Sequence, residues 1–233
     1  MAVALREQGL TATLSYAGRV ANPALQPIPV RTGGFGGVEG LANYLTREKI
    51  THLIDATHPF AAEISRHAVI AAAETTTALI ALVRPGWTAG PEDRWTKVPD
   101  IPAAATSLTG PARRIFLAMG RQHLAHFAGQ PQHHYLLRLI DPPDGTLPLP
   151  HTTLVIARGP FAESDDLDLL RFHQIDTIVA KNAGGTGAEA KLIAARRLGI
   201  PVILIDRPVL PNRRVTETVA GVMDWLHATP RGV

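Results

Sequence analysis

Cysteine is absent from this chain of 233 residues, which excludes disulfides, thiolate metal sites and cysteine nucleophiles together. Long apolar runs are also absent, since no stretch approaches the roughly 20 residues of a membrane span. The first residues lack the basic head and apolar stretch of a signal peptide. We therefore expect a soluble cytoplasmic protein without a membrane attachment.

Aromatic residues make up only 5% of the chain, so the stacking platforms of single-strand nucleic-acid binders are not expected. Long runs of like charge are missing, although the formal net charge is +3 and the isoelectric point is about 9.6. Such a moderate positive excess fits an anionic small molecule better than nucleic acid.

Two catalytic signatures are missing as well. The chain has 10 His residues but no His-Glu-x-x-His pattern, and His133 and His134 would point to opposite faces of a strand, so no metal site is predicted. No Gly-x-Ser-x-Gly elbow occurs, which argues against a serine hydrolase.

What the chain does contain is an alternation of short β-branched runs with Ala/Leu-rich stretches. This pattern predicts βαβ units and mostly parallel sheets, an α/β fold. The expected strands are residues 11–16, 29–32, 51–56, 78–83, 114–119, 133–139, 152–157, 177–180 and 201–205. The expected helices are residues 40–48, 61–75, 101–108, 123–128, 164–172, 187–198 and 217–227.

Two lobes are expected, residues 1–109 and 110–233, because the segment 85–99 is rich in Gly, Pro and Trp and precedes a second βα series. Ligands would bind at the lobe interface or at the carboxyl ends of the strands. Residues 5–9 resemble a helix end, with no strand and Gly-rich turn before it. Either the fold starts late or the sequence as given lacks roughly its first dozen residues, and we favour the second.

The string Asp55-Ala-Thr-His-Pro-Phe60 marks a corner between a strand and a helix. Pro59 suits the first helical position, and Thr57 or His58 suits the N-cap. Free amide groups at such a helix start bind anions, so we predict a ligand site here. The simpler alternative is a cap and a turn without a ligand.

Basic residues follow strand after strand. Parallel strands bring their carboxyl ends to one edge, so these cations are expected to gather around a ligand with several negative charges. Any one of them could instead be an ordinary solvated side chain. They are Arg19, Arg31, His58, Arg84, Arg121, Arg158, Lys181 and Arg207.

Arg19 follows the expected second strand of a dinucleotide fold, where an Arg accommodates the 2′-phosphate of NADP. The glycines of residues 33–37 permit close backbone approach to a cofactor, or form only a flexible turn. The loop from Lys181 to Gly185 precedes Thr186-x-x-Glu189, a capping-box pattern. A phosphate or carboxylate would meet the Lys and free amides there, although a capped helix alone also explains the box.

Together these strings resemble the precorrin-6A reductase family of cobalamin (vitamin B12) biosynthesis. The resemblance covers nearly the whole chain, and Asp-Ala-Thr-His-Pro-Phe is its most specific part. The strings that carry it are Arg31-Thr-Gly-Gly-Phe-Gly-Gly37, Ile54-Asp-Ala-Thr-His-Pro-Phe-Ala61, Gly120-Arg121, Arg158-Gly-Pro-Phe161, and Ala180-Lys-Asn-Ala-Gly-Gly185 with Lys191 downstream.

The resemblance implies two Rossmann-like lobes with a ligand cleft between them. It implies NADPH-dependent reduction of one double bond of the precorrin-6A macrocycle, giving precorrin-6B. Residues 1–109 would bind NADPH through Arg19, Gly33, Gly34, Gly36, Thr57, His58 and Pro59. Residues 110–233 would bind the tetrapyrrole through Arg121, Arg138, Arg158, Lys181, Gly184 and Gly185. His58 and Lys181 are the candidate proton donors, with bound water as a rival.

Family members typically begin with a strand and a Gly-Gly-Thr turn that this chain does not contain. Two alternative functions stay open. One is cobalt-precorrin-6A reductase of the anaerobic route, which the sequence does not separate from the metal-free enzyme. The other is a non-catalytic nucleotide- or anion-binding module. We expect a monomer, whose possible partners are other enzymes of the cobalamin pathway.

Overall fold

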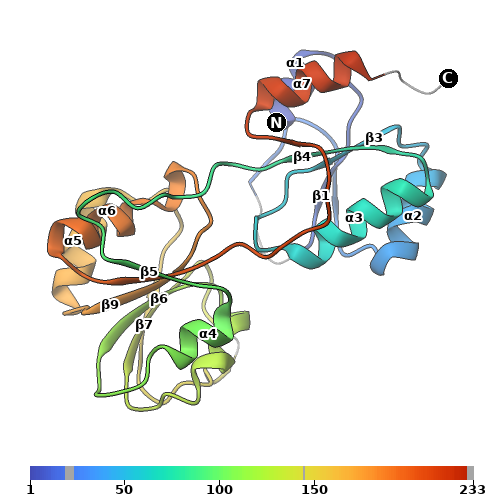
Figure 1. The fold of residues 1–233 in the computed structure, drawn as a ribbon. Coiled ribbons are helices and arrows are strands. Elements are labelled where there is room, and N and C mark those ends of the chain that lie inside the picture. Colours follow the sequence, from blue (N-terminus) through green and yellow to red (C-terminus); the bar gives the residue numbers. More distant parts are fainter. Residues whose placement is uncertain (19–23, 144, 230–233) are drawn as a thin grey trace. The chain divides into compact units, whose positions relative to one another are not determined.

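A computed structural model describes residues 1–18, 24–143 and 145–229. The chain forms two compact units (Figure 1). The first unit combines both ends of the chain, Met1–Arg84 and Val209–Val233, and the second unit is Pro85–Pro208. The expected boundary near 109–110 therefore lies inside the second unit, which corrects the predicted division of the chain.

The first unit contains two parallel sheets that share no strand pairing with each other. One sheet is β1 paired with β2, and the other has the order β11-β4-β3. The strands are β1 (Leu14–Tyr16), β2 (Val30–Thr32), β3 (His52–Asp55), β4 (Ala78–Leu82) and β11 (Val215–Thr216). The helices are α1 (Ala2–Glu7), α2 (Gly37–Arg47), α3 (Ala62–Glu74) and α7 (Val219–Ala228).

Helices cover both faces of the three-stranded sheet in the first unit (Figure 1). Leu53 and Leu79 pack against α2 and α3, while Ile54 and Ile80 pack against α7. Neighbouring residues of a strand point to opposite faces, so continuous apolar runs form strands that are buried on both sides.

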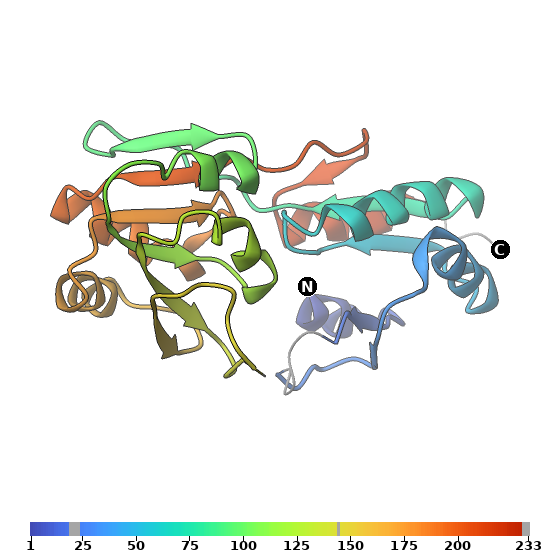
Figure 2. The same cartoon turned by 90° about the horizontal axis from the view of Figure 1, so that it is seen from below.

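The second unit is built on one six-stranded parallel sheet with the order β5-β10-β9-β6-β7-β8 (Figure 2). Its strands are β5 (Trp95–Val98), β6 (Arg114–Ala118), β7 (His134–Leu139), β8 (Thr152–Ile156), β9 (Thr177–Lys181) and β10 (Val202–Ile205). Its helices are α4 (Ile101–Thr106), α5 (Glu163–Phe172) and α6 (Ala190–Leu198), with the 3₁₀ helices η1 (Arg121–Phe127) and η2 (Thr186–Ala188).

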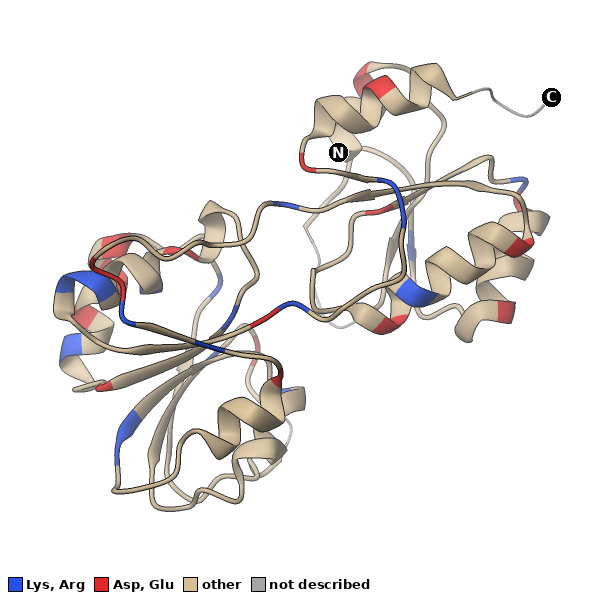
Figure 3. Cartoon of the chain, viewed as in Figure 1, with Lys and Arg blue, Asp and Glu red and all other residues tan. Residues whose placement is uncertain are grey.

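The core of the second unit lies between this sheet and the helices α5 and α6. Phe116, Ile178 and Leu204, from the central strands, are at most 1% exposed and pack with Leu170 and Leu192 of the two helices. Acidic residues predominate on α5, whereas the charged residues of α6 are all basic (Figure 3). A fully packed central sheet of this kind holds its strand ends rigidly, which suits a binding site.

All nine predicted strands are present, with boundaries within a few residues. Two strands were not predicted: β5 lies in the Gly/Pro-rich segment, and β11 has only two residues. Each predicted helix is also found, although residues 121–127 form a 3₁₀ helix. The helix end expected near Gly9 is confirmed, since Gly9 has φ +64° and its amide bonds to the carbonyl of Arg6 at 2.9 Å.

Candidate functional site

The turn after β3 is organised by Asp55, which is only 6% exposed. Its Oδ1 accepts hydrogen bonds from the amide of Thr57 at 3.1 Å and from the Thr57 hydroxyl at 2.7 Å. Arg213 approaches the other carboxylate oxygen at 3.7 Å. Asp55 thus has a structural role that the sequence reasoning missed. An Asp two residues before a Thr is nevertheless a recognisable turn signal.

His58 and Pro59 lie in this turn and not in a helix, which corrects the predicted helix start. The amide of Ala61 bonds to the carbonyl of His58 at 2.7 Å, and α3 begins at Ala62 with Ala61 as N-cap. Neither Thr57 nor His58 caps the helix. His58 is exposed, and its Nδ1 accepts a hydrogen bond from the amide of Phe60 at 3.2 Å.

The glycine loop after β2 is shaped by Arg31. Its guanidinium donates to the Ser15 hydroxyl at 2.7 Å and to the carbonyl oxygens of Gly33 and Gly34 at 3.0 and 3.1 Å. The same group lies 3.9 Å from the centroid of the Phe35 ring. Arg31 therefore stabilises the loop itself by binding two of its carbonyl groups.

Two of the three predicted cofactor glycines occupy backbone conformations that favour glycine. Gly33 and Gly36 have φ values of +122° and +82°. A side chain at Gly34 or Gly36 would meet no protein atom within 4 Å, so the space beside these backbones is open. Arg19, the predicted 2′-phosphate residue, lies outside the described residues.

In the second unit, Arg121 and Lys181 lie at the point where the sheet order reverses. From β6 the chain proceeds outward to β7 and β8, then returns to β9 on the other side of β6. Ala118 and Ala180 are partners across these two strands. The carboxyl ends of strands at such a switch point form the usual ligand crevice of open α/β sheets.

The segment after β9 is held from the buried side by residues to which the sequence reasoning gave no such structural role. The Asn182 side chain accepts from the amide of Trp87 at 2.8 Å and donates to its carbonyl at 3.2 Å. The Trp87 indole donates to the carbonyl of Gly185 at 3.0 Å. Arg207, expected to face a ligand, donates to the carbonyls of Asn182 at 2.9 Å and Ala183 at 3.1 Å.

The predicted capping box is not formed, which is a further correction. Thr186 begins a 3₁₀ turn, and α6 begins at Ala190 with Glu189 as N-cap and no side-chain cap bond. The glycines before it are nevertheless required by geometry. Gly184 and Gly185 have φ values of +69° and +73°. A loop that must pass close to another backbone favours such residues.

Arg138 and Arg158 have different surroundings. Arg138, on β7, forms an ion pair with Asp166 of α5, and its guanidinium lies 3.6 Å from the centroid of the Phe161 ring. The two charged side chains are 10% and 1% exposed. Arg158 is exposed and follows the edge strand β8. Arg138 therefore faces the interior, and its role as a substrate ligand stays a prediction.

Lys191 of α6 is a buried ammonium group next to this site. It is 5% exposed, donates to the carbonyl of Ala188, and lies 5.0 Å from the centroid of the Trp87 ring. Burial lowers its pKa from 10.5 to about 8, with the positive charge of Arg138 adding to the effect. The spacing of residues 191, 194, 195 and 198 on one helix face is a signal for inward placement.

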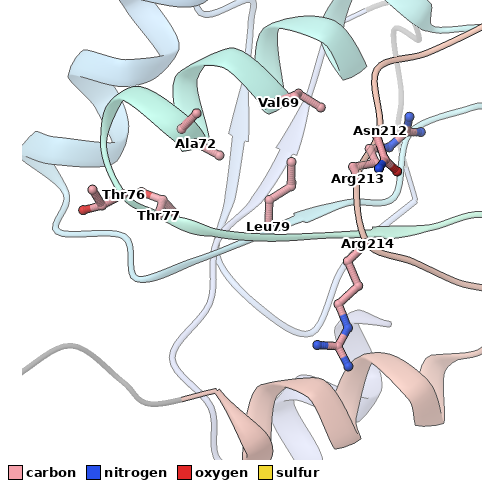
Figure 4. Close-up of a pocket in the computed structure, with 9 residues that line it drawn as sticks. Val69, Ala72, Thr76, Thr77, Leu79, Asn212, Arg213 and Arg214 are labelled. Atoms are coloured by element: carbon pink, nitrogen blue, oxygen red, sulfur yellow. The ribbon is translucent and has the colours of Figure 1, made fainter.

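A shallow cavity of about 370 Å³ lies elsewhere, between α3, β4 and the segment before β11 (Figure 4). Val69, Ala72 and Leu79 line it, while Arg214 points away from them. No predicted site residue lines this cavity.

In the described part of the chain, no three His, Asp or Glu side chains gather as a metal-binding group. No helix in residues 1–18, 24–143 and 145–229 is long and apolar enough to cross a bilayer.

The fold and the strand ends together define an α/β protein of two units, each with parallel strands whose carboxyl ends carry glycine turns and basic residues. Comparison with known proteins identifies it further. The profile of the family "Precorrin-6x reductase CbiJ/CobK" matches residues 1–227, and the chain belongs to this family.

Several relatives support this assignment. Precorrin-6A reductase of Rhodobacter capsulatus is 59% identical, and the match covers 100% of this chain and 94% of the relative. The Rhodococcus erythropolis enzyme of the same name is 46% identical over 96% and 90% of the two chains. A solved structure of "CobK precorrin-6A reductase" matches with a TM-score of 0.94 at 59% identity, covering 100% and 94% of the chains.

Proposed function

We propose that this protein is a precorrin-6A reductase, an oxidoreductase of cobalamin biosynthesis that reduces one macrocycle double bond of precorrin-6A to give precorrin-6B. The observation that carries this proposal is the full-length match to the Rhodobacter capsulatus enzyme at 59% identity. The α/β fold with basic strand ends is consistent with it, because a corrin precursor carries many carboxylates. We further propose that the protein acts in the cytoplasm and as a monomer.

The proposed cofactor is NADPH, bound by the first unit. Arg19, Gly33, Gly34, Gly36, Thr57, His58 and Pro59 would hold it. The open space beside Gly34 and Gly36 fits close approach of a phosphate to the backbone. The turn organised by Asp55 holds Thr57 in place for the same ligand. When bound, the nicotinamide supplies a hydride, and the protein supplies orientation.

The proposed substrate site lies in the second unit, around the switch point between β6 and β9. Arg121, Arg158 and Lys181 would pair with substrate carboxylates, since charge-assisted hydrogen bonds of this kind are strong and orient planar groups. The segment at Gly184 and Gly185 would bind a further carboxylate through its amides. Arg138 would contribute only if it left its ion pair with Asp166.

His58 and Lys181 are the proposed sources of the proton that completes the reduction. The Nδ1 of His58 accepts the Phe60 amide, so the proton of the neutral ring lies on Nε2. Only the doubly protonated ring could give a proton to the reduced macrocycle from that nitrogen, because a neutral imidazole does not release its single N–H proton. Lys181 is the last residue of β9 and lies directly at the switch point. Bound water is the remaining rival.

NADPH oxidation with metal-free and with cobalt-loaded precorrin-6A tests the proposal. Turnover with the metal-free substrate is expected. A preference for the cobalt form would favour the second candidate, the activity for which a relative from Priestia megaterium is named, 28% identical over 81% of this chain and 77% of that protein. Reduction of neither would favour a non-catalytic binding module.

Two sets of variants separate the proposed roles. Arg19→Ala should raise the KM for NADPH while sparing NADH, and equal effects on both would remove the 2′-phosphate role. Arg158→Ala and Lys181→Ala should raise the KM for precorrin-6A without changing that for NADPH. Unchanged precorrin affinity would exclude these residues from the substrate site.

A further inference from the structure

The segment Asn182–Ala188 is anchored from its buried side at four carbonyl groups. Arg207 binds the carbonyls of Asn182 and Ala183, the Trp87 indole binds that of Gly185, and Lys191 binds that of Ala188. Three side chains from separate parts of the second unit thus hold one short stretch of backbone. Lys191 and Trp87 are also in contact, with the ammonium group 5.0 Å from the ring centroid.

This anchoring determines where the amide groups of the segment point. In a trans peptide, the carbonyl of one residue and the amide of the next point in opposite directions. The amides of Gly184 and Thr186 therefore point away from Arg207 and Trp87. Neither amide donates to a protein acceptor within the described ranges 1–18, 24–143 and 145–229. Lys181, at the start of the segment, adds a positive charge to the same strand end.

A cluster of four charged groups lies behind the segment. Lys191 is faced by Arg138 from β7, Asp166 from α5 and Glu189 from the turn before α6. With Lys191 protonated, two positive and two negative groups balance. Without its proton the cluster carries a net negative charge, which would repel an anion at the amides. Because burial lowers the pKa of Lys191 to about 8, this change falls within an accessible pH range.

We propose that Lys191 is a positioning residue for the substrate: its ammonium group holds the Gly184–Ala188 backbone so that the Gly184 and Thr186 amides donate to a substrate carboxylate, and it balances the negative charge behind them. This inference rests on the proposed function, since precorrin-6A is the carboxylate ligand. Lys191 itself touches the segment and not the substrate.

Direct binding of precorrin-6A, followed through the absorbance of its chromophore, tests this role without requiring turnover. The dissociation constant is measured from about pH 6.5 to about pH 9.5 for the wild type, Lys191→Arg, Lys191→Met and the control Lys97→Met. Lys97 is an exposed lysine of the same unit. The KM for NADPH and the melting temperature are measured in parallel.

The wild-type dissociation constant should rise about five- to tenfold between pH 7 and pH 9, as the buried ammonium loses its proton. Lys97→Met should show the same profile. Lys191→Arg should bind with little change across this range, and Lys191→Met should bind weakly at every pH. The KM for NADPH should stay unchanged in all four proteins.

A wild-type dissociation constant that is independent of pH, or a Lys191→Arg profile identical to that of the wild type, would overturn the role of Lys191. The wild-type profile decides the question even if Lys191→Met fails to fold. Turnover of precorrin-6A with a flat binding profile would refute only this inference. Absence of precorrin-6A binding at every pH would refute the proposed function as well.

Discussion

Among the glycines of the second unit, Gly184 has the least room for a side chain. A side-chain carbon there would lie 1.9 Å from the carbonyl oxygen of Pro85 and 2.6 Å from the guanidinium of Arg207. Its φ of +69° adds a second penalty for any other residue. Gly187, in the following turn, has no atom within 4 Å of the same position. Packing therefore requires a glycine at position 184 but not at position 187.

We predict that Gly184→Ala lowers the free energy of unfolding by about 2 kcal/mol or more, because it combines overpacking with a strained backbone. Gly187→Ala, the matched control, should change it by less than about 0.5 kcal/mol. Urea denaturation measures both values. Equal stabilities of the two variants would contradict the close approach of Pro85 to the segment.

Lys191 should also affect stability in a pH-dependent way. Its folded pKa of about 8 lies below the ordinary value of 10.5, so between these values the unfolded chain binds a proton that the folded chain does not. The stability of the wild type relative to Lys191→Met should therefore increase as the pH rises through this window, by up to about 3 kcal/mol. Denaturation curves of both proteins at a series of pH values provide the measurement. A constant difference would show that the ammonium is not buried.

At the scale of elements, five helices end in the same way, with a residue of positive φ just after the last turn. They are Gly9, Lys49, Thr76, Gln174 and Gly199. At each, the amide of the following residue bonds back to a carbonyl in the last turn of the helix. Only two of the five are glycine. At the other three helix ends, a residue with a side chain adopts this strained backbone conformation.

Thr76, which follows α3, is the most strained of these because it is β-branched and has φ +54°. Thr76→Gly should raise the free energy of unfolding by about 1 kcal/mol. Thr76→Ala should stay close to the wild type, since alanine keeps the side-chain carbon that causes the strain. Thermal and urea unfolding compare the three proteins, and a destabilised Thr76→Gly would contradict this account of the helix end.

At the scale of the whole molecule, each unit has its own core, and no sheet is shared between the two units. The second unit is one continuous segment, Pro85–Pro208, whereas the first combines both chain ends. The strand β5 explains why the boundary lies before residue 85: it pairs in register with β10 from Trp95↔Val202 to Val98↔Ile205. Helix α4 packs against both β5 and β10.

A fragment of residues 85–208 should therefore fold alone, with cooperative unfolding and slowly exchanging amides in the central strands. The fragment 110–208 lacks β5 and α4, which leaves the edge of β10 uncovered, and should be markedly less stable. Circular dichroism and amide hydrogen exchange compare the two. Equal stability of the two fragments would indicate that the folding unit begins near residue 110, as expected from the sequence.

Local patterns in the sequence determined the elements of this protein and the edge where its ligands are expected. Alternating β-branched and Ala-rich runs place a buried strand or a helix whatever lies far away in the chain, so nine strands were predicted. Parallel strands in turn bring Arg121 and Lys181 to one edge. The string from Asp55 to Phe60 is specific enough to indicate the family that the comparisons confirmed.

Only the tertiary structure decided which basic residues face inward. Arg138 and Arg207 have sequence neighbours like those of the exposed cations, but their partners Asp166 and Asn182 lie 28 and 25 residues away in the sequence. The pairing of β5 with β10 and the joining of both chain ends into one unit are likewise long-range. Such contacts depend on where distant segments meet in the fold, and no local spacing encodes that.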